Sequence, residues 1–483
     1  MRSLVNQDSP SKSPPPFLNF LKDSFFISSS SGFLAVLAVI QAFWIPTILS
    51  LREFGLWKIF TLYGSYLSLL HLGFLDGLLL RWAGQSEGKI GSEKWMFFRK
   101  LLIQQTLVLL PLGILFGAIF SGSPFYWVVM FLLILAVVFN STQFFRVIFE
   151  SSKRFRTLSW AQIVGRSLFI GCLFIIPSAF LTQAKVIAII MIGAFSVQFL
   201  IMVSWSRSSQ RVDMDIKKDP HATWTNLTKQ GITILLVGLA LPFVIALDQF
   251  LLSVSVPVEK FSVYSFACGT LVPVLIMIQP ISHVMFPHLR SASEEEQKRV
   301  LELSRRGTGL FLGLFFCLYY LLTPLIHFLL PRYTMSLPLI RILVGSVGLL
   351  IVIQVLHFTY YKLVGRQHTF FILLAGAMIT MGIAIQSVIR TSGSLRGVAC
   401  VVLLGSVVLY VLSDRLLIGP LLKEERVRNW FYTLKPLLCL GFFWFLSILG
   451  FSFLKELFIY VILLGILFWW DYRTLKNSRP RLI

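Results

Sequence analysis

The stretch Arg52–Gly84, REFGLWKIFTLYGSYLSLLHLGFLDGLLLRWAG, is apolar enough in its middle to cross a bilayer, yet it carries His71, Asp76 and Arg81. A charge inside a bilayer costs at least about 2.5–3.5 kcal/mol on insertion scales, so such a side chain normally faces protein or a wet cavity. The stretch therefore predicts a membrane helix that lies against protein or water along part of its length.

The rest of the 483-residue chain has the same character, with 56% hydrophobic and only 13% charged residues. Apolar windows of about 20 residues, the length that crosses about 30 Å of hydrocarbon, recur along it. They predict an all-α polytopic membrane protein with about fourteen transmembrane helices. The predicted helices lie near residues 26–49, 56–79, 101–121, 125–145, 158–181, 185–205, 230–254, 262–286, 308–330, 338–361, 368–389, 396–417, 436–453 and 456–472.

The basic residues are distributed unevenly between the two sides of the membrane. With both termini inside, about 33 of the 43 Lys and Arg fall in the tails and even-numbered loops, and about 9 fall outside. By the positive-inside bias, this predicts a multi-pass membrane protein with both termini cytoplasmic. The net charge of +22 then reflects topology and contact with anionic membrane lipids. The sequence contains no basic domain with interleaved aromatic residues, so nucleic-acid binding is not expected.

An internal repeat divides the chain. The segment that begins at Glu259 follows the same plan as the opening stretch, since each is the second span of a six-helix set and runs inward to a basic loop. Such a repeat predicts two pseudo-symmetric six-helix lobes around a central cavity, followed by a C-terminal helix pair. The expected boundaries are a cytoplasmic tail at 1–25, an N-lobe at 26–205, a cytoplasmic linker at 206–229, a C-lobe at 230–417, a cytoplasmic loop at 418–435, the helix pair at 436–472 and a cytoplasmic tail at 473–483.

Short connections and missing motifs argue against an enzyme. The outer connections 121–124 and 181–185 are too short for a catalytic domain, and no GxxxxGK[ST] motif for ATP occurs. The five cysteines are scattered singly, with no CxxC and no partnering His at metal-ligand spacing, so no metal site and no cofactor are expected. Uphill transport would then need an ion gradient, with H⁺ or Na⁺ as the candidate coupling ion.

Several segments, taken in order, carry a resemblance to a known family. They are EFGLW at 53–57, HLGFLDGLLLRWA at 71–83, ALDQFLLS at 246–253, VEKFSVYSFA at 258–267, MFPHL at 285–289, RYTMSLPLIRIL at 332–343, GRQ at 365–367 and GSLRGVA at 393–399. In this order and spacing they resemble the O-antigen and related polysaccharide (Wzx-type) flippases of the multidrug/oligosaccharidyl-lipid/polysaccharide (MOP) export superfamily. Ser262–Tyr264 departs from the family pattern, in which the eighth helix opens with Gly-x-Tyr.

The resemblance implies fourteen helices in two lobes and a secondary transporter that works by alternating access. Its substrate would be an oligosaccharide on an undecaprenyl-pyrophosphate-type glycolipid, moved from the inner to the outer leaflet for the biosynthesis of O-antigen or capsule-like surface polysaccharide. Polysaccharide polymerase machinery is an expected partner. The resemblance does not identify the sugar.

The intramembrane cations and histidines are the candidate substrate-binding residues. They fall in the cytoplasmic halves of their predicted spans and would form a cationic vestibule, where guanidinium forks replace the water around a diphosphate. The candidates are Arg81, Arg166, Lys362, His283 and His357. Two alternatives stay open, because Arg81 also fits a topology anchor at the membrane surface and a neutral histidine also fits a hydrogen bond between packed helices.

Two carboxylates are candidates for coupling or charge balance. Asp76, five residues before Arg81, is expected to orient that guanidinium or to balance its charge in the empty site. Asp248 lies in the outer half of the seventh predicted helix, in a span otherwise free of charge, and is the candidate proton-responsive group. The structural alternative for Asp248 is a carboxylate that pairs with a neighbouring helix.

Two other function classes remain. A drug or organic-cation antiporter of the same superfamily should offer acids to its substrate, yet the first predicted helix contains no carboxylate. A membrane glycan polymerase or ligase is the other alternative, and the short outer loops argue against it.

The charge asymmetry predicts the sidedness of two loops. A single cysteine placed at Ser293 should react with a membrane-impermeant thiol reagent only from the cytoplasm, and one at Ser123 only from outside, since the asymmetry is large for loops this short. Labelling of both positions from the same side of intact cells and inverted vesicles would contradict the topology.

Overall fold

The computed structural model describes residues 16–83, 85, 87–207, 223–421, 426–449 and 452–477. In these residues all regular structure is helical and no strand occurs, which confirms the all-α class. The elements are α1 (Pro16–Ile48), α2 (Leu51–Gly64), η1 (Leu67–His71), α3 (Phe74–Trp82), α4 (Glu87–Ile119), α5 (Tyr126–Ser151), α6 (Phe155–Ile175), η2 (Ser178–Phe180), α7 (Ala184–Arg207), α8 (Trp224–Ser255), α9 (Val258–Ser291), α10 (Glu294–Leu329), η3 (Pro331–Ser336), α11 (Leu337–Val352), η4 (Ile353–His357), α12 (Phe358–Leu363), α13 (Gln367–Thr391), α14 (Leu395–Leu421), α15 (Arg426–Ile448) and α16 (Phe453–Asn477).

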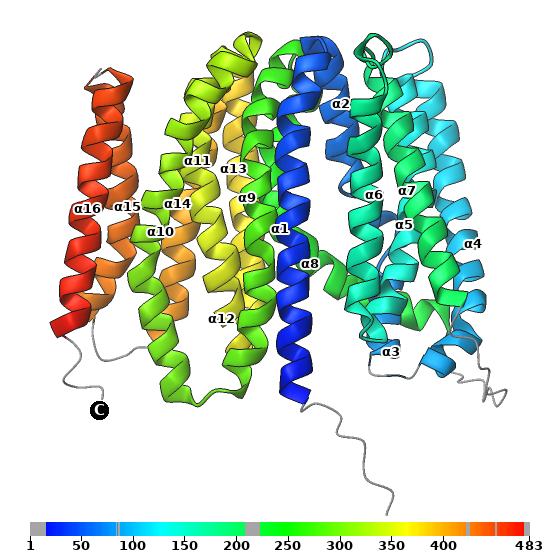
Figure 1. The fold of residues 1–483 in the computed structure, drawn as a ribbon, viewed down its shortest axis with the longest axis horizontal. Coiled ribbons are helices and arrows are strands. Elements are labelled where there is room, and N and C mark those ends of the chain that lie inside the picture. The colour runs from blue at the N-terminus through cyan, green and yellow to red at the C-terminus, as the bar shows by residue number, and fades with distance from the viewer. Residues whose placement is uncertain are drawn as a thin grey trace, which may run out of the picture.

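The long helices lie side by side and divide into two groups (Figure 1). We call α1–α7 the N-lobe and α8–α14 the C-lobe; α15 and α16 form a pair beyond α10, at the left edge of the view. α1 stands between the groups and packs on both α6 and α9, whereas α8 packs on α3 of the N-lobe and α13 of the C-lobe. The arrangement follows the predicted plan of two lobes and a C-terminal pair. We call the end at which α1 begins the inner end, because the charge bias predicts it to be cytoplasmic.

The described helices account for the predicted spans, though not all as single rods. Eleven are long and apolar enough to cross a membrane. The second predicted span, 56–79, is divided among α2, η1 and α3, and the last two correspond to α15 and α16. Four helices begin well before the predicted apolar segment: α1 at Pro16, α4 at Glu87, α10 at Glu294 and α15 at Arg426. Each of these extensions contains charged residues, so a search for uninterrupted apolar windows does not include it.

The second span is broken near its middle, contrary to the continuous helix expected for 56–79. Leu72 and Gly73 both adopt left-handed backbone angles, with φ of 51° and 82°. A break inside a membrane frees backbone groups that lipid cannot satisfy. The buried Asn140 of α5 donates its amide Nδ2 to the carbonyl oxygen of Leu67 at 3.2 Å, so a neighbouring helix satisfies part of the break.

Glycines bring the two lobes into backbone contact just beyond this break. A Cβ at Gly231 of α8 would lie 1.9 Å from the carbonyl oxygen of Gly73, and one at Gly77 would lie 2.1 Å from that of Leu227. Small residues permit such approach, and close van der Waals packing is a main source of helix association in lipid. α3 and α8 are therefore sealed against each other toward the inner end.

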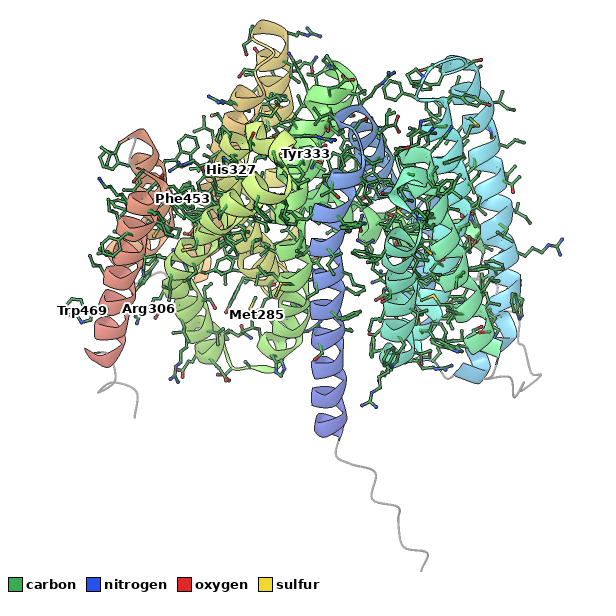
Figure 2. All side chains as sticks on the ribbon, turned by 45° about the horizontal axis from the view of Figure 1, so that its top comes forward. Met285, Arg306, His327, Tyr333, Phe453 and Trp469 are labelled. Carbon is green, nitrogen blue, oxygen red and sulfur yellow. The ribbon has the colours of Figure 1, made fainter. Side chains whose placement is uncertain are left out.

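A second contact joins the lobes toward the outer end. A Cβ at Gly55 of α2 would lie 2.5 Å from the carbonyl oxygen of Val258, the first residue of α9. Tyr333, which lies at the same end of the molecule as His327 (Figure 2), packs its ring 5.5 Å from that of Phe54. The lobes therefore touch on both sides of the membrane midplane.

The α3–α8 contact predicts that two glycines of α8 respond differently to substitution by alanine. Gly231→Ala should destabilise the protein by about 1–3 kcal/mol, since its new methyl group meets backbone that cannot move aside. Gly238→Ala in the same helix is the control, because nothing lies within 4 Å of a Cβ there and alanine favours the helix. Thermal unfolding in detergent measures both, and an equal midpoint for Gly231→Ala and wild type would contradict the close contact.

Candidate functional site

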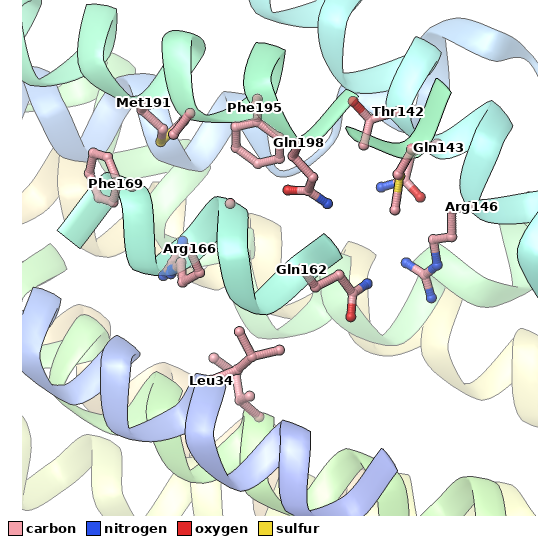
Figure 3. Close-up of a pocket in the computed structure, with 14 residues that line it drawn as sticks. Leu34, Thr142, Gln143, Arg146, Gln162, Arg166, Phe169, Met191, Phe195 and Gln198 are labelled. Atoms are coloured by element: carbon pink, nitrogen blue, oxygen red, sulfur yellow. The ribbon is translucent and has the colours of Figure 1, made fainter. Parts of the chain in front are cut away.

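A cavity of about 310 Å³ lies in the N-lobe and faces the C-lobe (Figure 3). Four N-lobe helices and α9 of the C-lobe enclose it. The residues that line it are Leu34 of α1, Thr142, Gln143 and Arg146 of α5, Gln162, Gly165, Arg166 and Phe169 of α6, Met191, Ala194, Phe195, Gln198 and Met202 of α7, and Ile276 of α9.

Helical periodicity explains how α6 presents its residues to this cavity. Gln162, Arg166 and Phe169 are separated by four and three residues, which places them on one face of a helix. Between them, Gly165 permits close packing on α7, since a Cβ there would lie 2.6 Å from Oε1 of Gln198. The amides of Gln162 and Gln198 thus lie around the same space as the guanidinium of Arg146 (Figure 3).

The cavity has a cationic and amide-rich lining. Arg166 makes no hydrogen bond or ion pair with any residue that the structure describes. Arg146 donates from Nε to a carboxylate oxygen of Glu150 at 2.7 Å, one turn further along α5. No carboxylate belongs to the lining, so the site can bind an anion through Arg166 and hydroxyl groups through its glutamines.

Arg81 and Asp76 do not form the pair that the sequence suggested. Nη2 of Arg81 lies 3.0 and 3.2 Å from the two carboxylate oxygens of Glu93 on α4, so Glu93 orients this guanidinium. The carboxylate of Asp76 instead lies 4.0 Å from Nδ1 of His71. Glu93, and not Asp76, is therefore the carboxylate bonded to Arg81, because α4 brings it nearer, and a role of Asp76 in charge balance stays a prediction. Neither Arg81 nor Asp76 lines the cavity, and the role of Arg81 in substrate binding stays a prediction.

His357 and Lys362 also lie away from the cavity. His357 ends the π-helical turn η4 and is buried, with Nδ1 2.6 Å from Oγ of Ser413 and Nε2 3.5 Å from Asp414. Lys362 of α12 holds its ammonium 3.9 Å from the ring centre of Phe358. His283 belongs to α9, and its side chain lies outside the described residues. The structure thus does not bring His357 and Lys362 together with Arg166 into one vestibule.

Asp248 is buried between α8 and α9. The hydroxyl of Tyr264 donates to Oδ2 at 2.5 Å, and the backbone N–H of Gln249 donates to Oδ1 at 2.7 Å. Tyr66, in the turn between α2 and η1, also contacts α8, because its hydroxyl donates to the carbonyl oxygen of Pro242 at 2.8 Å. The carboxylate therefore bonds across two helices near the contact between the lobes, and its role in coupling stays a prediction.

Sequence reasoning missed part of this site. Arg146 follows the predicted span 125–145 directly, so it was counted with the basic residues of the inner loops. Gln143, Gln162 and Gln198 carry no charge and match no motif. Gln143 lies one turn from Arg146 and Gln162 one turn from Arg166, but this spacing, and the place of Gln198, become usable signals only once α5, α6 and α7 are known to be neighbours. In the described residues no group of three or more His, Cys, Asp or Glu is placed to hold a metal.

Comparison with known proteins gives structural relatives. No protein family model matches the chain, and no curated protein sequence matches it. Its fold is similar to that of the lipid II flippase MurJ in an inward closed conformation, with 15% sequence identity, a TM-score of 0.64, and 95% of this chain and 99% of that chain covered.

Two further solved structures are also similar. One is an inward-facing multidrug resistance MATE family transporter of the MOP superfamily, with 15% identity, a TM-score of 0.56 and coverage of 84% and 96%. The other is a MOP superfamily transporter from Pyrococcus furiosus, with 14% identity, a TM-score of 0.54 and coverage of 82% and 94%. The chain is thus a multi-pass helical membrane protein with the fold of the MOP superfamily transporters.

Proposed function

We propose that this protein flips a polyprenyl-pyrophosphate-linked oligosaccharide from the inner to the outer leaflet of the plasma membrane. The observation that carries the proposal is the N-lobe cavity that faces the C-lobe, in which Arg166 lacks any described partner and glutamine amides lie close by. A likeness of fold to the lipid II flippase MurJ supports it. The product would serve the synthesis of a cell-surface polysaccharide of the O-antigen or capsule type.

The chemistry of the cavity suits a sugar diphosphate. A diphosphate must shed water before it enters the membrane, and a guanidinium replaces those hydrogen bonds with two parallel N–H donors. Gln143, Gln162 and Gln198 each offer both donors and acceptors, which match sugar hydroxyls. The prenyl chain would stay in the lipid while the headgroup occupies the cavity.

Alternating access would require the two seals between the lobes to open in turn. Separation of α3 from α8 at Gly73, Gly77 and Gly231 would admit the headgroup from the inner side. Separation of α2 from α9 near Gly55 would release it outside. Rocking of one lobe against the other around a fixed site is the usual way to obtain this alternation.

The coupling ion and the partners are further parts of the proposal. We propose that transport uses no ATP and is driven by H⁺ or Na⁺, with Asp248 as the titrating group. Both termini would lie in the cytoplasm. Anionic lipids of the inner leaflet would contact the basic inner loops, and polysaccharide polymerase machinery would receive the product. The alternative, an organic-cation antiporter, shares the fold of the MATE transporter but is disfavoured by a cavity lining without a carboxylate.

The proposal predicts that Arg166 is required for export. Arg166→Ala should reduce surface polysaccharide at least about tenfold at normal protein abundance, because a hydrogen bond to a charged group contributes about 1.5–3 kcal/mol. Arg166→Lys should recover only part, since an ammonium lacks the planar fork. Arg390→Ala, at an exposed site on α13, is the control. Wild-type export by Arg166→Ala would refute phosphate binding in this cavity.

The proposal also predicts that Asp248 is required for coupling. Asp248→Asn keeps an oxygen that accepts the Tyr264 hydroxyl but removes titration, so it should abolish the stimulation of flipping by an imposed pH gradient. Flipping of fluorescent glycolipid in reconstituted vesicles, with and without the gradient, measures this. A mutant that responds to the gradient as wild type does would show that Asp248 is not the coupling group.

A further inference from the structure

Lys58 of α2 is a cation in the interface between the lobes that has no acidic partner. Its side chain is partly buried, and its ammonium lies 5.4 Å from the centre of the Phe54 ring. Among the residues that the structure describes, no hydrogen bond or ion pair to this ammonium is present.

This lack of a partner contrasts with three arginines in the same helical assembly. Arg81 binds Glu93 of α4, Arg305 binds Asp414 of α14 at 2.9 Å, and Arg341 binds Glu456 of α16. Each carboxylate compensates for the water that its guanidinium has lost. Lys58 resembles Arg166 instead, because neither cation has a described carboxylate to balance it.

The position of Lys58 relates it to the cavity. Its Nζ would lie 2.3 Å from a Cβ at Gly269 of α9, so the missing side chain at Gly269 makes room for the ammonium. Gly269 and Ile276 are seven residues apart and share one face of α9, with Gly269 about 10 Å nearer the outer end. Ile276 lines the cavity.

A ring contact ties the same part of α2 to the cavity wall. Trp57, the neighbour of Lys58, stacks on Phe169 with ring centres 6.2 Å apart, and Phe169 lines the cavity. The cation therefore lies beside the cavity on its outer side, between Arg166 and the contact of Gly55 with Val258.

We propose that Lys58 is a second phosphate-binding residue, which receives the diphosphate of the substrate after it leaves Arg166 and before it is released outside. This inference rests on the proposed function and adds a step to it. Two cations, one on α6 and one on α2, divide one costly crossing into shorter transfers, because the dianion is never without a nearby positive charge. A lysine suits the later position, since its ammonium is a point charge without the bidentate geometry that holds a phosphate firmly.

A purely structural role makes the opposite prediction. If Lys58 only packs on Phe54, its four-carbon stem and its ring contact are what matter, and a methionine of similar length preserves most of that packing. Substitution by methionine would then leave transport unchanged.

The test measures binding and flipping separately on the full-length protein. Binding of a fluorescent polyprenyl-pyrophosphate oligosaccharide is measured in detergent, and its flipping is measured in reconstituted vesicles. Lys58→Met should bind as wild type does, because Arg166 is intact, but should flip at least about tenfold more slowly, as expected for loss of one charged contact. Lys58→Arg should restore flipping only in part, since it keeps the charge but its bidentate geometry holds the phosphate more firmly and slows release.

A second variant moves the ammonium without removing it. Gly269→Ala should also slow flipping and leave binding unchanged, because its methyl group displaces only the flexible end of Lys58. Lys185→Met, at an exposed lysine near the start of α7, is the matched control and should flip normally. Thermal unfolding of each variant checks that the fold is kept.

Three other outcomes would contradict either this inference or the proposed function. Normal flipping by Lys58→Met would overturn the inference while leaving the proposed function intact. Loss of binding together with flipping would place Lys58 in the first binding site and overturn the separate transfer step. Failure of the wild-type protein to flip the glycolipid would overturn the proposed function itself.

Discussion

The interior of a bilayer supplies no water to a buried charge, and this constraint explains how the cations of this protein are placed. Arg81, Arg305 and Arg341 each bind a carboxylate from another helix, so each guanidinium both keeps its charge and joins two helices. Loss of one partner from such a buried pair typically costs about 3–5 kcal/mol. Arg166 and Lys58 differ from these three, because no carboxylate among the described residues compensates for either charge.

The same constraint applies to the backbone. The left-handed residues Leu72 and Gly73 interrupt the second span, and Asn140 supplies a hydrogen bond that lipid cannot. The break also exposes glycine backbone to α8, which allows the close contact at Gly231. Irregular backbone within a membrane is tolerated where protein or a cavity surrounds it, and here it lies where the two lobes meet.

Polar bonds also hold the C-terminal pair to the C-lobe. Thr433 of α15 donates to Asp414 at 2.5 Å, and the hydroxyl of Tyr460 on α16 donates to the carbonyl oxygen of Gly313 at 2.8 Å. Arg341 of α11 bonds Glu456 of α16. Apolar faces gain little by leaving lipid for one another, so polar bonds contribute specificity to this packing. His357, predicted as a substrate ligand, lies 3.5 Å from Asp414 in this polar cluster and not in the cavity.

The sequence by itself determined the helical class, predicted two lobes with an added pair, and singled out Arg166 as an isolated intramembrane charge, because apolar length and intramembrane charge act locally along the chain. It also indicated Asp248 as a buried carboxylate. Only the tertiary structure decided which helices are neighbours, and therefore that Glu93 rather than Asp76 orients Arg81. It likewise decided that Arg146 and three glutamines join Arg166, and that Lys58 lies against Gly269. The reason is physical: a pairing between helices depends on their relative rotation and spacing, and one sequence read along its length contains no direct measure of either.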